Sequence, residues 1–371
     1  MFQTASVDWD TANGTTPRIP LHPEEKGDKH SPRKGAPVSI RLVRRAALFA
    51  LLVGLTAAAT GQPPAAPAAK PVYLFGYNLK VRPGGQTDWT KATAVGVELN
   101  RDTGTNALLA VTESGSLAVV AGEPTANKKA DWVFALDLKV RKAEEDRFTT
   151  ETFTVGVEMF KEGVTGKLMY LSEKKGLTFA DAPAAVTGEK NPVWQYGLIL
   201  KCRKPEEAGF TKDTKKFGLD VFKDDNTGGL LYATDDGGLS AGGAAPAMAP
   251  EEGKVVAPKS LYGLVVRVRK ADEANFTEKT KKYGVEVYKD ENSGQLVYLS
   301  ETGSLAVVPP PAKMTEKTGV TWKHALVIKA RPAGVDFAKA AKYGIEVVED
   351  NNTGHLIYIS ETGSIAVLPK K

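Results

Sequence analysis

Two columns of opposite charge recur five times along the chain, and they are the residues best suited to binding a ligand. An arginine closes a Lys/Arg-x-Arg tripeptide in every copy, at Arg82, Arg141, Arg203, Arg269 and Arg331. An acid follows in a later β-rich stretch, at Glu98, Glu158, Asp220, Glu286 and Glu346. If the strands that carry them are neighbours, both columns share one face. There they either pair across strands or form a ring of charge for an anionic or sugar ligand.

A third column has the composition of half a calcium loop. Acid and amide oxygens alternate and end in glycine in "DDNTG" (224–228), "DENSG" (290–294) and "DNNTG" (350–354). The possible Ca²⁺ ligands are Asp224, Asn226, Asp290, Asn292, Asp350 and Asn352. The distal glutamate of an EF-hand is missing, and Asp and Asn also form turns by bonding their own backbone. We therefore expect hairpin turns and no cofactor, with Ca²⁺ as the alternative.

Two further columns are expected to be structural. A Ser/Thr-acid pair recurs at Thr112-Glu113, Ser172-Glu173, Thr234-Asp235, Ser300-Glu301 and Ser360-Glu361. It predicts tight turns in which side-chain oxygens hold backbone N–H groups. Tyrosines recur at Tyr170, Tyr232, Tyr298 and Tyr358. We expect them to pack inside the sheets, or, if one edge is exposed, to form a stacking platform for sugars.

Other catalytic chemistry is poorly represented. Beyond residue 60 the chain has only two histidines, His324 and His355, at unrelated positions, which argues against a His-rich zinc site or a Ser-His-Asp triad. Both are expected on the surface or in a strand. The single cysteine, Cys202, falls in a column of small apolar residues and is expected in the core. No P-loop or G-x-G-x-x-G motif is present.

The columns recur because the chain is an internal repeat. A glycine that precedes a β-rich run marks each copy, with spacings of 60, 62, 66 and 60 residues, at Gly96, Gly156, Gly218, Gly284 and Gly344. The repeats span 73–120, 132–180, 194–241, 260–308 and 322–368. Connectors rich in Pro, Ala and Gly separate them and vary in length, which is typical of loops.

Each repeat predicts four strands. The first alternates with period two, as in "WVFALDLKVR" (132–141), where Trp132, Phe134 and Leu136 are expected on one buried face. A Lys-rich piece with one aromatic anchor follows, either a turn or two of helix or an anchored loop. The anchors are Trp89, Phe148, Phe210, Phe276 and Phe337. Asp/Asn/Gly hairpin signals then separate three more strands.

The fold class follows from burial on two sides. The third and fourth strands are apolar on both faces, as in "QLVYLS" and "SLAVV", so neighbouring copies must cover them. Five four-stranded repeats then predict a mainly β chain, folded as a five-bladed β-propeller. The first and last copies share no strand that would lock a ring. The alternative is therefore a row of five small β-rich α+β modules.

The N-terminal segment predicts export. Residues 1–37 are polar and Pro-rich, and we expect them to be disordered or untranslated. Residues 38–60 combine arginines, an apolar run and an Ala-rich site, as in a signal peptide. A Pro/Ala linker spans 61–72. The apolar run is too short for an ordinary membrane span. The expected location is secreted, or periplasmic and cell-envelope, with no membrane span beyond the signal segment.

Charge and symmetry limit the function. A net charge of +5 over 371 residues does not predict a nucleic-acid binder. Polar residues that repeat in register would form weak sites about five times, which favours multivalent binding, whereas an enzyme needs one cluster of unlike groups. We expect a non-enzymatic binding or structural module for a protein or polysaccharide of the cell envelope. The alternative is a glycosidase-type enzyme in which two of the repeated acids converge at the propeller axis.

Overall fold

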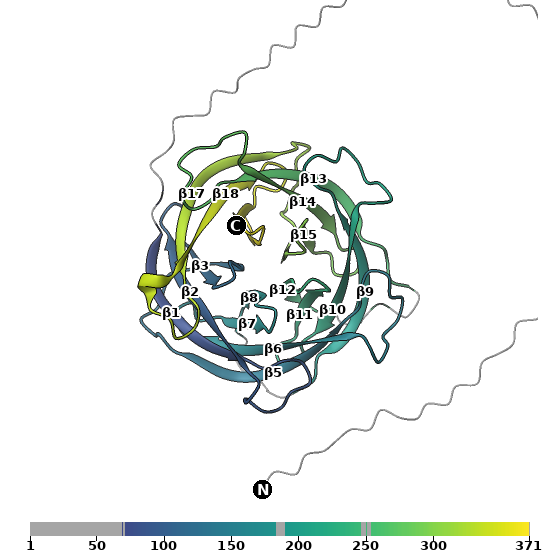
Figure 1. Ribbon diagram of the computed structural model, residues 1–371. Coiled ribbons are helices and arrows are strands. Elements are labelled where there is room, and N and C mark those ends of the chain that lie inside the picture. Colours follow the sequence, from purple (N-terminus) through teal and green to yellow (C-terminus); the bar gives the residue numbers. More distant parts are fainter. Residues whose placement is uncertain (1–68, 70, 183–189, 246–249, 251–253, 371) are drawn as a thin grey trace, which may run out of the picture. The chain divides into compact units, whose positions relative to one another are not determined.

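The described part of the chain is a five-bladed β-propeller (Figure 1). The structure is a computed structural model that describes residues 69, 71–182, 190–245, 250 and 254–370. The predicted head, signal peptide and most of the linker lie outside these residues. Each repeat forms one four-stranded antiparallel sheet, or blade, with its strands paired in chain order. The five blades form a ring rather than a row of modules.

The strands occupy the same places in every blade. The first strands are β1 (Val72–Val81), β5 (Ala130–Val140), β9 (Val193–Cys202), β13 (Lys259–Val268) and β17 (Val320–Ala330). The second strands are β2 (Thr93–Asp102), β6 (Phe153–Glu162), β10 (Lys215–Lys223), β14 (Lys281–Lys289) and β18 (Ala341–Asp350). The third strands are β3 (Ala107–Thr112), β7 (Leu168–Ser172), β11 (Gly229–Thr234), β15 (Leu296–Ser300) and β19 (Leu356–Ser360). The fourth strands are β4 (Leu117–Ala121), β8 (Leu177–Ala180), β12 (Leu239–Ala244), β16 (Leu305–Val308) and β20 (Ile365–Leu368).

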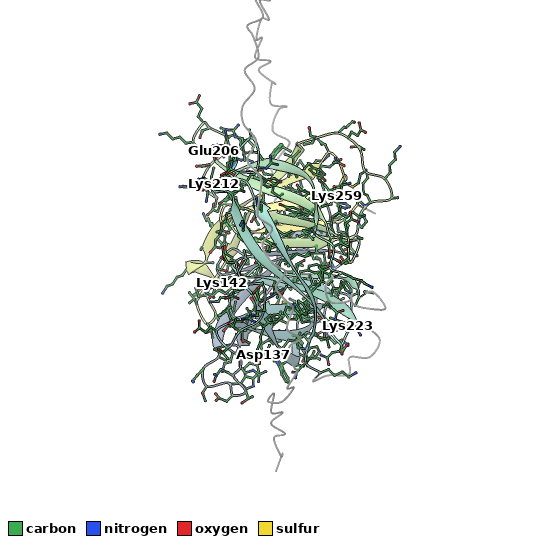
Figure 2. All side chains as sticks on the ribbon, turned by 90° about the vertical axis from the view of Figure 1, so that its right-hand side faces the viewer. Asp137, Lys142, Glu206, Lys212, Lys223 and Lys259 are labelled. Atoms are coloured by element: carbon green, nitrogen blue, oxygen red, sulfur yellow. The ribbon has the colours of Figure 1, made fainter. Side chains whose placement is uncertain are left out.

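The chain runs from the outside of the ring to its axis within each blade. The long first strands form the outer wall, and the short fourth strands contact one another around the axis (Figure 1). Because the strands are antiparallel, the loops between first and second strands and the turns between third and fourth strands lie at the same end of the ring. In Figure 2, which shows the ring from the side, Lys142, Glu206 and Lys212 project from this end. Lys223 and Lys259 project from the opposite end.

The core lies between blades rather than within them. In β15, Leu296 and Tyr298 belong to the cluster shared with the fifth blade, whereas Val297 and Leu299 belong to the cluster shared with the third. Each pair of neighbouring blades encloses one such cluster, and we call this contact a joint. Two-sided burial therefore has the expected cause, because each blade is covered by both of its neighbours.

The ring closes without a shared strand. The joint between the fifth and first blades contains its own apolar cluster, with Leu109 and Val111 of β3 against Leu326 and Ile345. β20 contacts β4 at the axis, and β17 contacts β2 near the outer wall, as the equivalent strands do at the other joints. The propeller therefore closes through contacts between its first and last blades, and the absence of a locking strand does not prevent closure.

A β-bulge places Trp132 on the opposite face from the one that the sequence predicted. The pairing of β5 with β6 shifts between Trp132 and Phe134, so Val133 is an extra residue. Phe134 and Leu136 face the core as expected, but Trp132 is turned away and is 44% exposed. The period-two alternation does not reveal this shift, because an inserted residue moves the preceding side chain to the other face.

The Lys-rich pieces are anchored loops in four of the five copies. A short 3-10 helix (η1, Phe337–Lys339) occurs in the fifth blade, where Asp336 accepts from the Ala338 N–H at its start. In the described residues of the other copies the same piece consists of turns and bends. Of the two expected alternatives, the anchored loop is therefore the general one.

Candidate functional site

The two charged columns meet across the joints, not within a blade. Each arginine forms an ion pair with the acid of the next blade. The pairs are Arg82–Glu158 (2.7 Å), Arg141–Asp220 (2.6 Å), Arg203–Glu286 (2.6 Å), Arg269–Glu346 (2.7 Å) and Arg331–Glu98 (2.8 Å). All five acids are buried. The expected pairing therefore exists, but it joins neighbouring blades, and these columns form no open ring of charge.

These acids do not supply the catalytic pair that a glycosidase requires. They lie on the second strands, whereas the fourth strands surround the axis. Each is paired with an arginine, so none presents a free carboxylate to an open cleft. The arrangement that would place two of them on either side of a sugar bond is not formed by Glu98, Glu158, Asp220, Glu286 or Glu346.

Aromatic rings enclose the guanidinium groups. The Arg82 guanidinium carbon lies 4.4 Å from the Trp89 ring centre and 5.7 Å from that of Trp132. The Trp132 indole N–H donates to Glu158 Oε2 over 2.6 Å, and Arg82 Nη1 donates to the Thr87 carbonyl over 3.0 Å. Cation–π contact and charge-assisted hydrogen bonds thus hold both the ion pair and the rings in place.

These rings form pairs at the outer rim of four joints. One ring comes from the loop of one blade and the other from the start of the next blade's first strand. The pairs, which we call the rim aromatic pairs, are Trp89/Trp132, Phe148/Trp194, Phe276/Trp322 and Phe337/Tyr73, with ring centres 4.9–6.3 Å apart. Trp89, Trp132, Trp194 and Tyr73 are each about 40% exposed. At the remaining joint no described ring pairs with Phe210, because Ser260 occupies the position that Trp132 has in the second blade.

Sequence reasoning missed these pairs, although the chain contains a signal for them. Trp132, Trp194 and Trp322 each stand three residues before the small residue that faces the buried acid. Aligning the repeats on that position would have exposed an aromatic column. The alternation instead assigned Trp132 to the core face.

The proposed calcium column forms hydrogen-bonded turns. Asp224 Oδ1 accepts from the backbone and side-chain amides of Asn226, and Oδ2 accepts from the hydroxyls of Thr227 and Tyr170. Asp290 and Asp350 accept from their own turns in the same way. Their partners Asn292 and Asn352 likewise belong to these turns. Among the described residues, no group of three or more His, Cys, Asp or Glu side chains could hold a metal ion.

The tyrosine column makes a second set of bonds across the joints. The hydroxyls of four buried tyrosines donate to a buried acid of the next blade. The bonds are Tyr170–Asp224 (2.8 Å), Tyr232–Asp290 (3.1 Å), Tyr298–Asp350 (2.8 Å) and Tyr358–Asp102 (2.9 Å). Burial, reinforced by the neighbouring carboxylate, raises the pKa of each hydroxyl far above its usual value. These tyrosines therefore stay neutral donors, as packing residues and not as an exposed platform.

The histidines and the cysteine lie in the interior. His324 Nε2 is 3.0 Å from both carboxylate oxygens of Asp102, across the joint that closes the ring. His355 donates from Nε2 to the Pro309 carbonyl, and burial lowers its pKa. Cys202 is buried as expected, and burial raises the pKa of its thiol. In these environments the thiol stays protonated and each imidazole has a structural partner.

In four of the five Ser/Thr-acid turns the acid accepts a hydrogen bond from the loop of the preceding blade. Glu113 Oε2 accepts from the backbone N–H groups of Gly96 and Ala333, both over 3.1 Å, and Oε1 pairs with Lys175 over 2.7 Å. Burial alone would raise the pKa of Glu113, but these bonds outweigh it and lower the pKa. At Glu301, by contrast, burial and the Glu206 carboxylate together raise the pKa.

Opposite pKa shifts predict opposite effects of the same substitution. The lowered pKa means that ionised Glu113 stabilises the fold at neutral pH, and that this contribution is lost as the pH falls through its folded pKa. The raised pKa means that ionised Glu301 opposes folding at neutral pH, and that the opposition fades as the pH falls. We expect Glu113→Gln to lower, and Glu301→Gln to raise, the urea midpoint at pH 7. Both effects should shrink by about pH 3; equal shifts in one direction would contradict this.

A pocket lies on the axis at the end that carries these turns. Its volume is about 280 Å³, and the turns between third and fourth strands of all five blades line it. The polar lining consists of Ser114, Ser116, Lys174, Asp236, Thr302, Ser304, Thr362 and Ser364. We call it the axial pocket. None of its lining residues belongs to the predicted charged columns, so the structure places those columns and this pocket apart.

Comparisons with known proteins leave the function open. No protein family matches the chain, and no curated protein matches it. One similar solved structure is a catalytically inactive virginiamycin B lyase from Staphylococcus aureus with quinupristin, at 12% identity over 80% of this chain and 73% of that one, with a TM-score of 0.12. Another is the selenomethionine-substituted enzyme, at 10% identity over 80% and 88%, with a TM-score of 0.12. Similarity this low carries no argument about this chain.

Proposed function

We propose that the protein is a secreted or envelope-associated, non-enzymatic binding protein that holds a polysaccharide at several equivalent weak sites on its rim. The observation that carries the proposal is the set of rim aromatic pairs, which recur at four joints and include an exposed ring at three of them. The location rests on the signal-like segment 38–60. Within the described residues, no helix is long and apolar enough to cross a membrane.

The chemistry of the pairs fits a sugar ring. Tryptophan and tyrosine offer a large apolar face together with a polar edge, which suits the apolar CH face and hydroxyl edge of a pyranose. The charge of Arg82 is neutralised by Glu158, so the Trp89/Trp132 pair has no net charge to select an anion. The rings are held by the joint itself, so little side-chain entropy is lost on binding.

Repetition around the ring compensates for weak single sites. A polysaccharide repeats its sugar as the rim repeats its aromatic pair, so one chain can engage two or more sites together. Linked weak contacts of this kind raise overall affinity by about 10²–10⁴ when the geometry permits simultaneous binding. A single groove for one ligand would not need the same feature at successive joints.

The test is binding of the purified protein to insoluble cellulose, chitin and peptidoglycan sacculi. We expect at least one polymer to retain it, and expect the variant carrying Trp132→Leu, Trp194→Leu and Trp322→Leu to lose about tenfold or more of the affinity. Phe210→Leu, at the joint without a pair, is the matched control and should bind normally. Circular dichroism and denaturation confirm that each variant is folded.

A gain-of-function variant makes the test sharper. Ser260→Trp places an indole beside Arg203, Phe210 and Glu286 and so supplies a fifth pair. We expect it to bind more tightly and to stabilise the fold by about 1 kcal/mol. Retention of a folded triple variant equal to that of the native protein, or retention of native protein by none of the polymers, would overturn the polysaccharide proposal. In the second case a protein partner is the remaining candidate.

A further inference from the structure

The axial pocket departs from the five-fold symmetry of the ring in an ordered way. In the first, fourth and fifth blades the turn ends in serine, at Ser116, Ser304 and Ser364. In the second and third blades it ends in glycine, at Gly176 and Gly238. The three blades with serine are consecutive around the ring, and so are the two blades with glycine. At the last position of the turn, one side of the pocket therefore carries hydroxyl groups and the other side carries none. The joints between blades are alike around the ring, so they do not explain why some turns end in serine and others in glycine.

The glycine side leaves two backbone donors without the serine acceptor that is present at two other blades. At the start of its fourth strand, Ile365 donates its N–H to Ser304 of the preceding blade, and Leu117 donates to Ser364 in the same way, both over 3.0 Å. Leu239 and Leu305 occupy the equivalent positions, but the preceding turns end in glycines, which have no hydroxyl. Among the described residues, no side chain accepts from either N–H group, so both can donate to an acceptor from outside the chain.

Three backbone carbonyls of the turns at the pocket already accept hydrogen bonds. The Gly303 carbonyl accepts from the Thr234 hydroxyl over 3.1 Å, and the Gly363 carbonyl accepts from Thr302 over 3.0 Å. The Gly115 carbonyl accepts from Ser360 over 3.2 Å. The pocket therefore offers donors, in the form of backbone N–H groups and serine hydroxyls, while these three carbonyls are occupied.

Two charged side chains line the pocket, Lys174 and Asp236. Asp236 is paired with Lys215 over 2.5 Å, and Lys175 is paired with Glu113. Lys174 lines the pocket and is exposed, and no ion pair joins it to an acid among the described residues. Its ammonium lies over the Phe153 ring, 4.6 Å from the centre, at the same end of the propeller. Of the two lining charges, Asp236 therefore has a partner of opposite sign, and Lys174 has none among the described residues.

We propose that the axial pocket binds a carboxylate group, as a site separate from the rim. The carboxylate oxygens accept from the Leu239 and Leu305 N–H groups and from the serine hydroxyls, and Lys174 supplies the opposite charge. A volume of about 280 Å³ is close to that of small ligand pockets and accommodates one sugar-sized acid. The source is either a free small acid or a uronic acid residue within a polysaccharide.

Calorimetric titration of the whole protein tests the site. The probes are galacturonate, its neutral counterpart galactose, acetate and polygalacturonate. We expect galacturonate to bind with a dissociation constant in the millimolar range or tighter, and galactose to bind at least tenfold more weakly. Binding of acetate identifies the free acid as a sufficient ligand, and binding of galacturonate and polygalacturonate without acetate identifies the uronic acid. Equal affinity for galactose and galacturonate, or no binding of any acid, overturns the proposal.

Charge variants locate the site. Lys174→Glu should abolish galacturonate binding, and Asp236→Asn should strengthen it, because the first reverses and the second removes a charge beside the ligand. Lys142→Ala is the matched control, since Lys142 is an exposed lysine at the same end of the ring (Figure 2). Unchanged binding in a folded Lys174→Glu variant overturns the assignment. The triple rim variant should still bind galacturonate, so failure at the rim and failure at the axial pocket are distinguishable.

Discussion

Replacing Arg82 with methionine should lower the free energy of unfolding by about 3–5 kcal/mol, because it leaves the buried Glu158 carboxylate without its counter-ion. In the native protein that carboxylate accepts from the Arg82 guanidinium over 2.7 Å and from the Trp132 indole over 2.6 Å, and it is almost completely buried. The indole alone cannot compensate a buried charge. Urea denaturation at pH 7, followed by tryptophan fluorescence, measures the loss.

A surface pair provides the control for this prediction. Arg101 pairs with Glu123 over 2.7 Å, as close as the pair at the joint, but the Glu123 side chain is 72% exposed. Solvent screens such a pair, so Arg101→Met should cost no more than about 1 kcal/mol. If Arg82→Met costs no more than Arg101→Met, the joint pairs are not structural.

Removing both partners separates the cost of an unpaired buried charge from the contribution of the ion pair itself. The double variant with Arg82→Met and Glu158→Met has no buried charge and retains apolar volume between the rings. It should be more stable than Arg82→Met alone, since replacing a buried ion pair by apolar side chains of similar size is often neutral or favourable. The loss in free energy of unfolding of the double variant could instead equal the sum of the losses of the two single variants. That result would show that the ion pair stabilises the joint beyond compensating a buried charge.

The sequence predicted the blade well because the blade is local. Alternation over the first strand, hairpin signals and two-sided apolar strands all concern residues close together in the chain. They indicated four strands per repeat, the two-sided burial of Leu296 to Leu299 and the core position of Cys202. A single inserted residue was enough to defeat this reasoning at Trp132, because the bulge changes the face without changing the composition.

The joints could not be predicted in the same way. Five arginines and five acids in register allow each arginine to pair within its own blade or with either neighbour, and the repeat looks identical in all three cases. Only packing decides that Arg82 reaches Glu158, 76 residues away. The axial pocket is less visible still, since the difference between Ser304 and Gly238 gains meaning only when the turns meet around the axis.

Gly284→Ala should lower the free energy of unfolding by about 3 kcal/mol or more, the upper end of the overpacking range. A β-carbon there would overlap the Arg203 backbone carbonyl, whose chain passes directly over the second strand. The backbone cannot move aside easily, because the Arg203 guanidinium is bound to Glu286 and to the Ala208 carbonyl. Gly209→Ala is the control: nothing lies within 4 Å of its β-carbon position, so the change should stay within about 0.5 kcal/mol.

The same substitution in the first blade tests closure of the ring. The β-carbon of an alanine at Gly96 would overlap the Arg331 carbonyl, and Arg331 belongs to the last blade. In a closed propeller Gly96→Ala should therefore destabilise the protein as strongly as Gly284→Ala, in the same urea experiment. In an open row the first blade would have no neighbour on that side, and the substitution would be harmless. A neutral Gly96→Ala beside a destabilising Gly284→Ala would contradict closure, because only the joint between the two ends of the chain distinguishes the two glycines.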